Sequence, residues 1–466
     1  MKKILSTLLI PLFLISCIQE PDKGYQEPEY KILNYQEGGS IFCSFSYPSV
    51  DENGDPVTLS SALMAYNPTD ADTSALIRSL IIACHITITS NDESPSLLKS
   101  KTILKDPWLM YMLPQAAAIP QLRQSLVIMP DYEGFGISAN RSHPYLAHQL
   151  TAQQVCDAVK YGLEIYRSLA KALPFSTDWK SICIGYSQGG SAALATHKYI
   201  EQNSLDNELH FTGSFCAGGP YDLVETLRYY IMDDGHSDGV ETSHTKGSLS
   251  LPQVLALIVK GMVDTHPHMK QHRLSDYFSK QFLDTGIMEW LDKKEKTTDD
   301  IAAELYKMCE NGLTAADGTI YSPGQMQTLF PSHRKSQYLI GTTYGVSADL
   351  SVMLSSDLYE YLNDEDSYNR TQQFTGDRFD DLMAALRENS LVKGWEPVHK
   401  IVLLHSKYDT VVPFSNAVSF KQEHSDADIR LVSYGDGGHQ NTGSNFYIAL
   451  LNNTFSKEFT WLFAEK

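Results

Sequence analysis

The feature that most constrains this chain is a glycine–serine–glycine motif that separates an apolar run from a helical one. Residues 181–184 are typical of a buried strand, and residues 191–197 are typical of a helix. Between them stand Gly185, Ser187 and Gly189, each separated from the next by one residue. A turn this tight strains the serine backbone, and a Cβ atom at either flanking position would clash. The stretch therefore predicts a strand–turn–helix element that exposes the serine at the end of a strand.

A serine hydroxyl is a weak nucleophile, so it needs a neighbouring base, and that base needs an acid to orient it. After a strand–turn–helix serine, these partners follow in the order acid, then histidine. Asp409 comes just after a strand predicted at 400–406, and His439 ends a glycine-rich loop after the last predicted strand, 429–434. The spacing predicts Ser187 as nucleophile, Asp409 as acid and His439 as base.

Other titratable residues have competing interpretations. Asp436 is close to His439 in sequence and is the alternative acid, although a loop rather than a strand end would deliver it. His405 lies within a predicted strand and is expected to be buried, and His197 on the helix after the serine is expected to be structural. Asp131 follows a strand but precedes the serine, so we expect it to hold a glycine turn at 134–136.

The oxyanion of an acyl-transfer intermediate needs two backbone N–H donors. The first is expected from Gln188, the residue after the nucleophile. The second is expected from Ile86 or Thr87, in the loop after the strand that ends near His85. Lipase-like sites often carry a glycine after such a histidine, and this chain has none there.

Strands and helices alternate along most of the chain, which predicts a mostly parallel sheet with helices on both faces. An antiparallel hairpin at the sheet edge is expected from the first two strands. The core is expected over 37–220 and 395–466. The pattern of the intervening residues predicts a large helical cap without strands over 221–394. An independent second domain is the alternative interpretation of that insertion. Helix-like segments in it lie at 251–262, 274–291, 299–310 and 379–391.

The N-terminus reads as a targeting segment. Lys2 and Lys3 precede an apolar run that is too short to span a membrane and that ends at Cys17. Residues 1–17 resemble a bacterial lipoprotein signal peptide with its lipobox, which implies lipidation of Cys17. Residues 18–36 are expected to be a flexible tether. We expect the protein to be exported and to be anchored by acyl chains in the bacterial cell envelope, on the periplasmic or surface face. A plain secretory signal is the alternative.

The net charge and the cysteine content restrict which partners, disulfides and metal sites are expected. The formal net charge of −19 argues against nucleic acid as a partner. Six cysteines remain after Cys17, three of them in apolar strand-like runs, so no disulfide is predicted. No cysteine or histidine spacing is typical of a metal site, and no cofactor and no protein partner are expected.

Together, Ser187 in its glycine motif, Asp409 and His439 resemble the α/β-hydrolase superfamily. More narrowly, the stretches 130–136, 185–190 and 389–397 resemble the secretory lipase family of the Candida antarctica lipase A type. The resemblance implies a serine carboxylic-ester hydrolase (esterase or lipase) with a helical cap, acting on a small-molecule ester.

Two other functions remain open. A serine peptidase of the same fold often carries a propeller or an acidic clamp, and neither is identifiable here. A non-catalytic ligand-binding envelope lipoprotein would be expected to have a damaged triad. Aromatic residues of the insertion could line a pocket for aryl esters or acylated glycans, or could simply be its core; they are Tyr229, Tyr230, Tyr277, Phe278 and Trp290.

Overall fold

The computed structural model describes residues 30–38, 40–68, 75–97, 110, 112–236, 242–338, 341–370 and 373–464. The predicted signal peptide, with Cys17, and the predicted tether up to residue 29 lie outside the described residues. Within the described ranges, no helix is long and apolar enough to cross a membrane.

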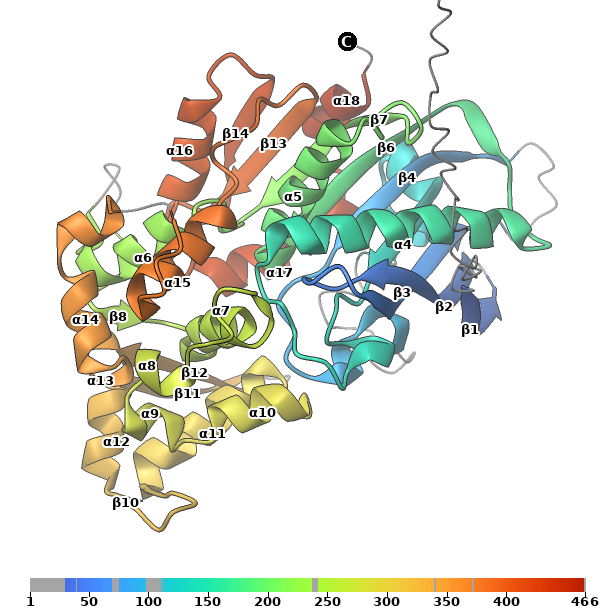
Figure 1. Ribbon diagram of the computed structural model, residues 1–466. Coiled ribbons are helices and arrows are strands. Elements are labelled where there is room, and N and C mark those ends of the chain that lie inside the picture. The colour runs from blue at the N-terminus through green and yellow to red at the C-terminus, as the bar shows by residue number, and fades with distance from the viewer. Residues whose placement is uncertain are drawn as a thin grey trace, which may run out of the picture.

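A nine-stranded sheet forms the centre of the fold, in the order β1-β2-β3-β5-β4-β6-β7-β13-β14 (Figure 1). The strands are β1 (Lys31–Glu37), β2 (Ser40–Val50), β3 (Pro56–Tyr66), β4 (Ile77–Cys84), β5 (Ser125–Pro130), β6 (Phe175–Tyr186), β7 (Phe211–Ala217), β13 (Lys400–His405) and β14 (Ile429–Ser433). From β1 to β5 neighbouring strands pair antiparallel, and from β5 to β14 they pair parallel. The predicted mostly parallel sheet with an antiparallel edge is confirmed.

The register brings distant segments to one edge of the sheet. In β6, Gly185 pairs with Cys84 of β4 on one side and with Cys216 of β7 on the other. Because the carboxyl ends of parallel strands meet at the same edge, the loop after β4, the serine turn after β6 and the loop after β13 come together there.

Strand β1 corrects part of the predicted tether. Residues Lys31–Glu37 pair antiparallel with β2 as the edge strand, so the tether prediction is wrong over 31–36. Every side chain of β1 is exposed. An edge strand held mainly by backbone hydrogen bonds carries no buried apolar face, so its composition resembles that of a loop.

Helices cover both faces of the sheet, as predicted. One face packs against α4 (His148–Ser168), α5 (Gln188–Gln202) and α16 (Ser415–Glu423). The other face packs against α2 (Leu113–Ala116), α3 (Pro120–Arg123), α17 (His439–Leu451) and α18 (Ser456–Phe463). The chain turns between α17 and α18, where Asn453 has a positive φ of 66°.

The insertion forms a lobe beside the sheet with a hydrophobic cluster of its own (Figure 1). Its helices are α6 (Leu223–Met232), α7 (Pro252–Thr265), α8 (Leu274–Tyr277), α9 (Lys280–Leu283), α10 (Ile287–Lys293), α11 (Thr298–Asn311), α12 (Pro323–Leu329), α13 (Leu350–Met353), α14 (Ser356–Leu362) and α15 (Arg378–Glu388). The one helix expected at 274–291 is three short ones, because the backbone is extended at Phe278 and Ser279 and left-handed at Gly286.

The expectation of an insertion without strands is wrong. A three-stranded sheet joins β8 (Ser248–Leu249), β12 (Gly341–Asp349) and β11 (Ser332–Tyr338), and β9 (Leu313–Thr314) pairs with β10 (Ile320–Tyr321). Most side chains of β11 are exposed or half-buried, so this hairpin lacks the apolar alternation by which strands are recognised.

Candidate active site

Ser187 lies at the turn between β6 and α5 with a strained backbone, φ 58° and ψ −124°. The positions on either side of Ser187 require glycine, because neither has room for a Cβ atom. A Cβ on Gly189 would collide with the carbonyl oxygen of Cys84 and would lie 2.7 Å from that of His85, and a Cβ on Gly185 would collide with the carbonyl of Gly189. The predicted strand–turn–helix is therefore present, packed directly against the end of β4.

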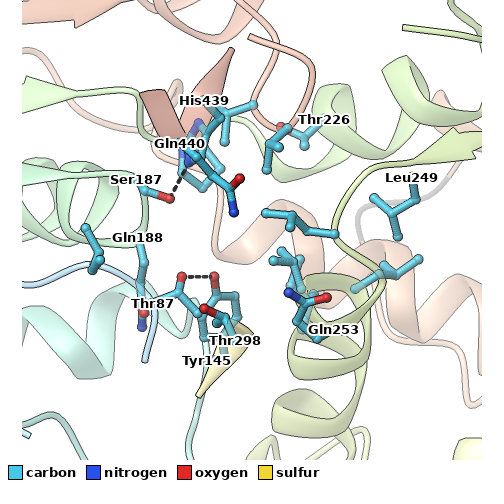
Figure 2. A pocket seen from close by; sticks show the side chains of 18 of the residues that line it. Thr87, Tyr145, Ser187, Gln188, Thr226, Leu249, Gln253, Thr298, His439 and Gln440 are labelled. Atoms are coloured by element: carbon cyan, nitrogen blue, oxygen red, sulfur yellow. Dashed lines mark hydrogen bonds between the residues drawn. The ribbon is translucent and has the colours of Figure 1, made fainter. Parts of the chain in front are cut away.

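The structure joins Ser187, His439 and Asp409 by hydrogen bonds. Ser187 Oγ lies 2.8 Å from His439 Nε2, and His439 Nδ1 lies 2.6 Å from Asp409 Oδ2 (Figure 2 shows the first of these contacts). The other carboxylate oxygen, Oδ1, accepts the backbone N–H groups of Val411 at 2.9 Å and Val412 at 2.8 Å. The three residues named from sequence thus form one chain of contacts.

The charge on Asp409 is stabilised in a fully buried position. Burial on its own would raise the pKa of this carboxyl group, but the imidazoles of His439 and His405 and the N–H of Val412 outweigh it and hold the pKa below its ordinary value. His405 is buried, as expected, yet its Nε2 also lies 3.7 Å from Asp409 Oδ2. Sequence reasoning did not anticipate that second contact.

Two details of the loop around His439 differ from expectation. His439 is the first residue of α17 rather than part of a loop, and its carbonyl accepts the hydroxyl of Tyr186 at 2.6 Å. The carboxylate that contacts it belongs to Asp409, whereas the alternative acid, Asp436, is exposed.

The residues expected at the oxyanion site line the same cavity as Ser187. Gln188 opens α5, and its side-chain Nε2 lies 3.2 Å from Nε2 of His143. Ile86 and Thr87 follow β4, which ends at Cys84, next to the expected end near His85. Thr87 Oγ1 lies 2.7 Å from the hydroxyl of Tyr145.

His143 and Tyr145 were missed by the sequence analysis. Their only local signal is a polar and aromatic pair in the loop that follows the glycine turn at 134–136, which is too weak to assign a role.

A cavity of about 1010 Å³ extends from Ser187 and His439 into the insertion. Aliphatic side chains dominate its wall on α6, α7 and α15, among them Leu223, Leu227, Val254, Leu255, Ile258, Val259, Leu382 and Leu386. Of the five aromatic residues considered from sequence, Tyr230 alone lines this cavity; the other four belong to the hydrophobic cluster of the insertion or pack against it.

Among the described residues, His197, Glu201 and His399 bring three candidate metal-ligand atoms within 4.8 Å of one another. The Glu201 carboxylate, however, already accepts N–H groups from Trp395 (2.8 Å), from the backbone of Val398 (3.0 Å) and from the backbone of His399 (2.6 Å). A carboxylate so fully hydrogen-bonded is an anchor, and it ties the chain returning from the insertion to the end of α5.

Asp131 has the supporting place expected for it. Its carboxylate accepts the hydroxyls of Ser60 and Ser96 at 2.5 Å, and Ser60 Oγ in turn accepts the N–H of Ile137 beside the glycine turn. Burial raises the pKa of Asp131 to about 6. The six cysteines after Cys17 are all buried and unpaired.

The sequence matches no family model and no curated protein. Among solved structures, the rice cell wall degrading esterase LipA of Xanthomonas oryzae superposes with a TM-score of 0.62 at 18% identity, over 92% of this chain and 97% of its own. Candida antarctica lipase A in its closed state superposes with a TM-score of 0.54 at 14% identity, over 92% of this chain and 82% of its own. The predicted α/β-hydrolase fold, resembling that of Candida antarctica lipase A, is confirmed.

Proposed function

We propose that this protein is a serine hydrolase that cleaves carboxylic esters through Ser187, His439 and Asp409. The observation that carries the proposal is the hydrogen-bonded chain from Ser187 Oγ through His439 to a buried carboxylate, at one end of a large cavity. The esterase and lipase that share the fold support an ester as the substrate.

In the proposed reaction, Ser187 Oγ attacks the ester carbonyl while His439 Nε2 takes its proton. Asp409 keeps the other ring nitrogen protonated and stabilises the imidazolium that forms. The backbone N–H of Gln188 and one from Ile86 or Thr87 bind the oxyanion. His439 then protonates the departing alcohol. Water next attacks the acyl-enzyme carbonyl and gives a proton to His439, which returns it to Ser187 Oγ as the bond to the acyl group breaks and the carboxylic acid leaves.

The cavity favours an aliphatic acyl group. Its volume is at the upper end of the range of about 300–1,000 Å³ that is typical of small-molecule sites. Leucine and valine side chains from three helices of the insertion line it, and such a surface gains free energy by covering hydrocarbon. We therefore infer a substrate whose acyl chain extends from Ser187 under the insertion.

The test is hydrolysis of p-nitrophenyl esters from acetate to palmitate by the wild type, Ser187→Ala and Ser419→Ala. Loss of the nucleophile should lower kcat by about 10⁴–10⁶-fold. Ser419 is the matched control, because its hydroxyl bonds only within α16, to the carbonyls of Ser415 and Asn416. Comparable turnover by Ser187→Ala would refute the proposal.

A fluorophosphonate probe separates the remaining alternatives, because it labels only an activated serine. Labelling of Ser187 without turnover of any ester would favour a peptidase, and an aminoacyl-amide panel would follow. Absence of labelling would favour a non-catalytic binding protein.

For localisation, we propose export and lipidation at Cys17, on the strength of the N-terminal sequence. The expected result is incorporation of labelled palmitate into the full-length wild type in bacterial cells and none into Cys17→Ser. Equal labelling of both proteins would contradict the anchor.

A further inference from the structure

The short segment from His143 to Tyr145 contacts two of the residues expected to supply oxyanion donors, Gln188 and Thr87. On one side, the Gln188 side chain donates an N–H to His143 Nε2 at 3.2 Å. On the other, the Tyr145 hydroxyl is 2.7 Å from Thr87 Oγ1 (Figure 2). His143 and Tyr145, which are separated by one residue in sequence, therefore contact both the start of α5 and the loop after β4, the two places expected to supply the oxyanion donors.

The ring of His143 has one defined hydrogen-bonding role for each nitrogen. Burial lowers its pKa to about 3, so the ring is neutral near neutral pH. Nδ1 lies 2.7 Å from the carbonyl oxygen of Glu133 and must donate to it, which leaves Nε2 as the acceptor for Gln188. The Glu133 side chain is itself held by Arg141 at 2.6 Å and Gln154 at 2.8 Å.

Tyr145 is equally fixed. It is buried, and burial raises its pKa to about 12, so its hydroxyl stays protonated and available to Thr87. Its ring stands edge-on to that of His143, with centroids 5.7 Å apart.

The insertion touches this segment through its backbone. Helix α7 approaches so closely that a Cβ on Gly261 would lie 2.8 Å from the backbone nitrogen of Tyr145 and 2.9 Å from the carbonyl oxygen of His143. A larger residue there would push either the helix or the segment away. The position of the segment thus depends on α7.

We propose that His143 and Tyr145 are positioning residues that hold Gln188 and Thr87 in the geometry needed for oxyanion binding, and that helix α7 sets the position of both. This inference rests on the proposed ester hydrolysis. It gives the insertion a second task besides covering the substrate: the oxyanion site is complete only when α7 is seated on the segment.

The consequence is kinetic. When N–H donors move away from the developing oxyanion, the transition state loses more stabilisation than the enzyme–ester complex does, so kcat falls while KM changes little. A displacement of about 1 Å can cost about 10²-fold in rate. We therefore expect losses of about 10-fold to 100-fold when a supporting contact is removed.

The first experiment is a double-mutant cycle on an ester that the wild type hydrolyses. His143→Leu and Gln188→Leu should each lower kcat by about 10-fold to 100-fold with KM within about twofold, and the double variant should be no slower than the slower single one. His143→Gln, which keeps an acceptor, should recover part of the loss. Additive effects, or unchanged kcat in His143→Leu, would overturn the role of His143.

The second experiment compares Gly261→Ala with Gly324→Ala. Both glycines are in helices of the insertion, but a Cβ on Gly324 would meet only Ser322 Oγ, at 3.9 Å. We expect Gly261→Ala and Tyr145→Phe to lose kcat while thermal melting shows a folded protein, and Gly324→Ala to keep it. Full activity of Gly261→Ala would overturn the role of α7. A wild type that neither hydrolyses esters nor takes up a fluorophosphonate would refute the proposed function itself, which is a distinct result.

Discussion

Replacing Asp409 with asparagine should disable the protein for a reason that can be read from its hydrogen bonds. Asp409 Oδ1 accepts two backbone N–H groups, from Val411 and Val412, and Oδ2 faces His439 Nδ1. An asparagine has one oxygen, and the two N–H donors require it on their side. Its amide NH₂ must then point at Nδ1.

An NH₂ group facing Nδ1 forces that nitrogen to be the acceptor, so the ring proton moves to Nε2. In that tautomer His439 cannot take the proton of Ser187. We expect kcat to fall by about 10⁴-fold, equivalent to about 5 kcal/mol in the activation free energy. The assay is hydrolysis of p-nitrophenyl butyrate under saturating substrate, with thermal melting to show that the variant is folded.

Asp436→Asn is the matched control, because it makes the same carboxyl-to-amide change near His439 at an exposed position. Its kcat should stay within about twofold of the wild type, as is usual for surface substitutions away from a site. If Asp409→Asn keeps more than a tenth of the activity, or if Asp436→Asn loses as much, the assignment of the acid is wrong.

Three further predictions concern the surroundings of the site. Burial raises the pKa of Asp131 from 3.8 to about 6, so the protonated carboxyl group stabilises the folded protein. This stabilisation is complete below pH 4 and is lost as the pH rises through 6. Relative to Asp131→Asn, the free energy of unfolding of the wild type in urea should therefore fall by up to about 3 kcal/mol between pH 4 and 7, and parallel pH curves would contradict this. In Glu201→Gln an NH₂ group replaces one of the two acceptor oxygens, either Oε2, which accepts Trp395 Nε1, or Oε1, which accepts the backbone N–H of His399. One N–H donor is then left facing another, so the free energy of unfolding should fall by about 2–4 kcal/mol with kcat unchanged in the folded protein, and an unaltered urea midpoint would count against the anchor. Gly189→Ala pushes a Cβ into the Cys84 carbonyl, so ester hydrolysis should drop by more than about 100-fold, and near-normal turnover would show that the turn can relax.

Most of the core could be predicted because its signals are local. Buried strands such as β6 and β13 carry continuous apolar runs, and the glycine–serine–glycine motif has only one conformation that it fits. The elements that were missed lack such a signal. Strand β1 has no buried face, and β11 and β12 lack a clear alternation of apolar and polar residues. Pairing with neighbouring strands, rather than a sequence pattern, therefore defines them as strands.

The candidate site was predictable to the same extent. Ser187, Asp409 and His439 each follow a strand end, and the order of the three along the chain restricts the choice. The contact of His405 with Asp409 and the support of Gln188 by His143 join residues that no spacing rule connects. The first contact joins the end of β13 to the loop that follows it, and the second joins α5 to the loop before α4, so both form only when the core has packed.

The sequence by itself determined the strand–turn–helix at Ser187, because only glycine tolerates the crowding on either side of the serine. It also determined the alternation that requires a covered parallel sheet. Tertiary structure alone decided that Asp409 rather than Asp436 faces His439, that the cavity wall carries more aliphatic than aromatic side chains, and that α7 rests on the His143–Tyr145 segment. The physical reason is that the first group of features depends on backbone sterics and periodicity within a few residues, whereas the second depends on which surfaces approach one another after the chain has folded back over 30 residues or more.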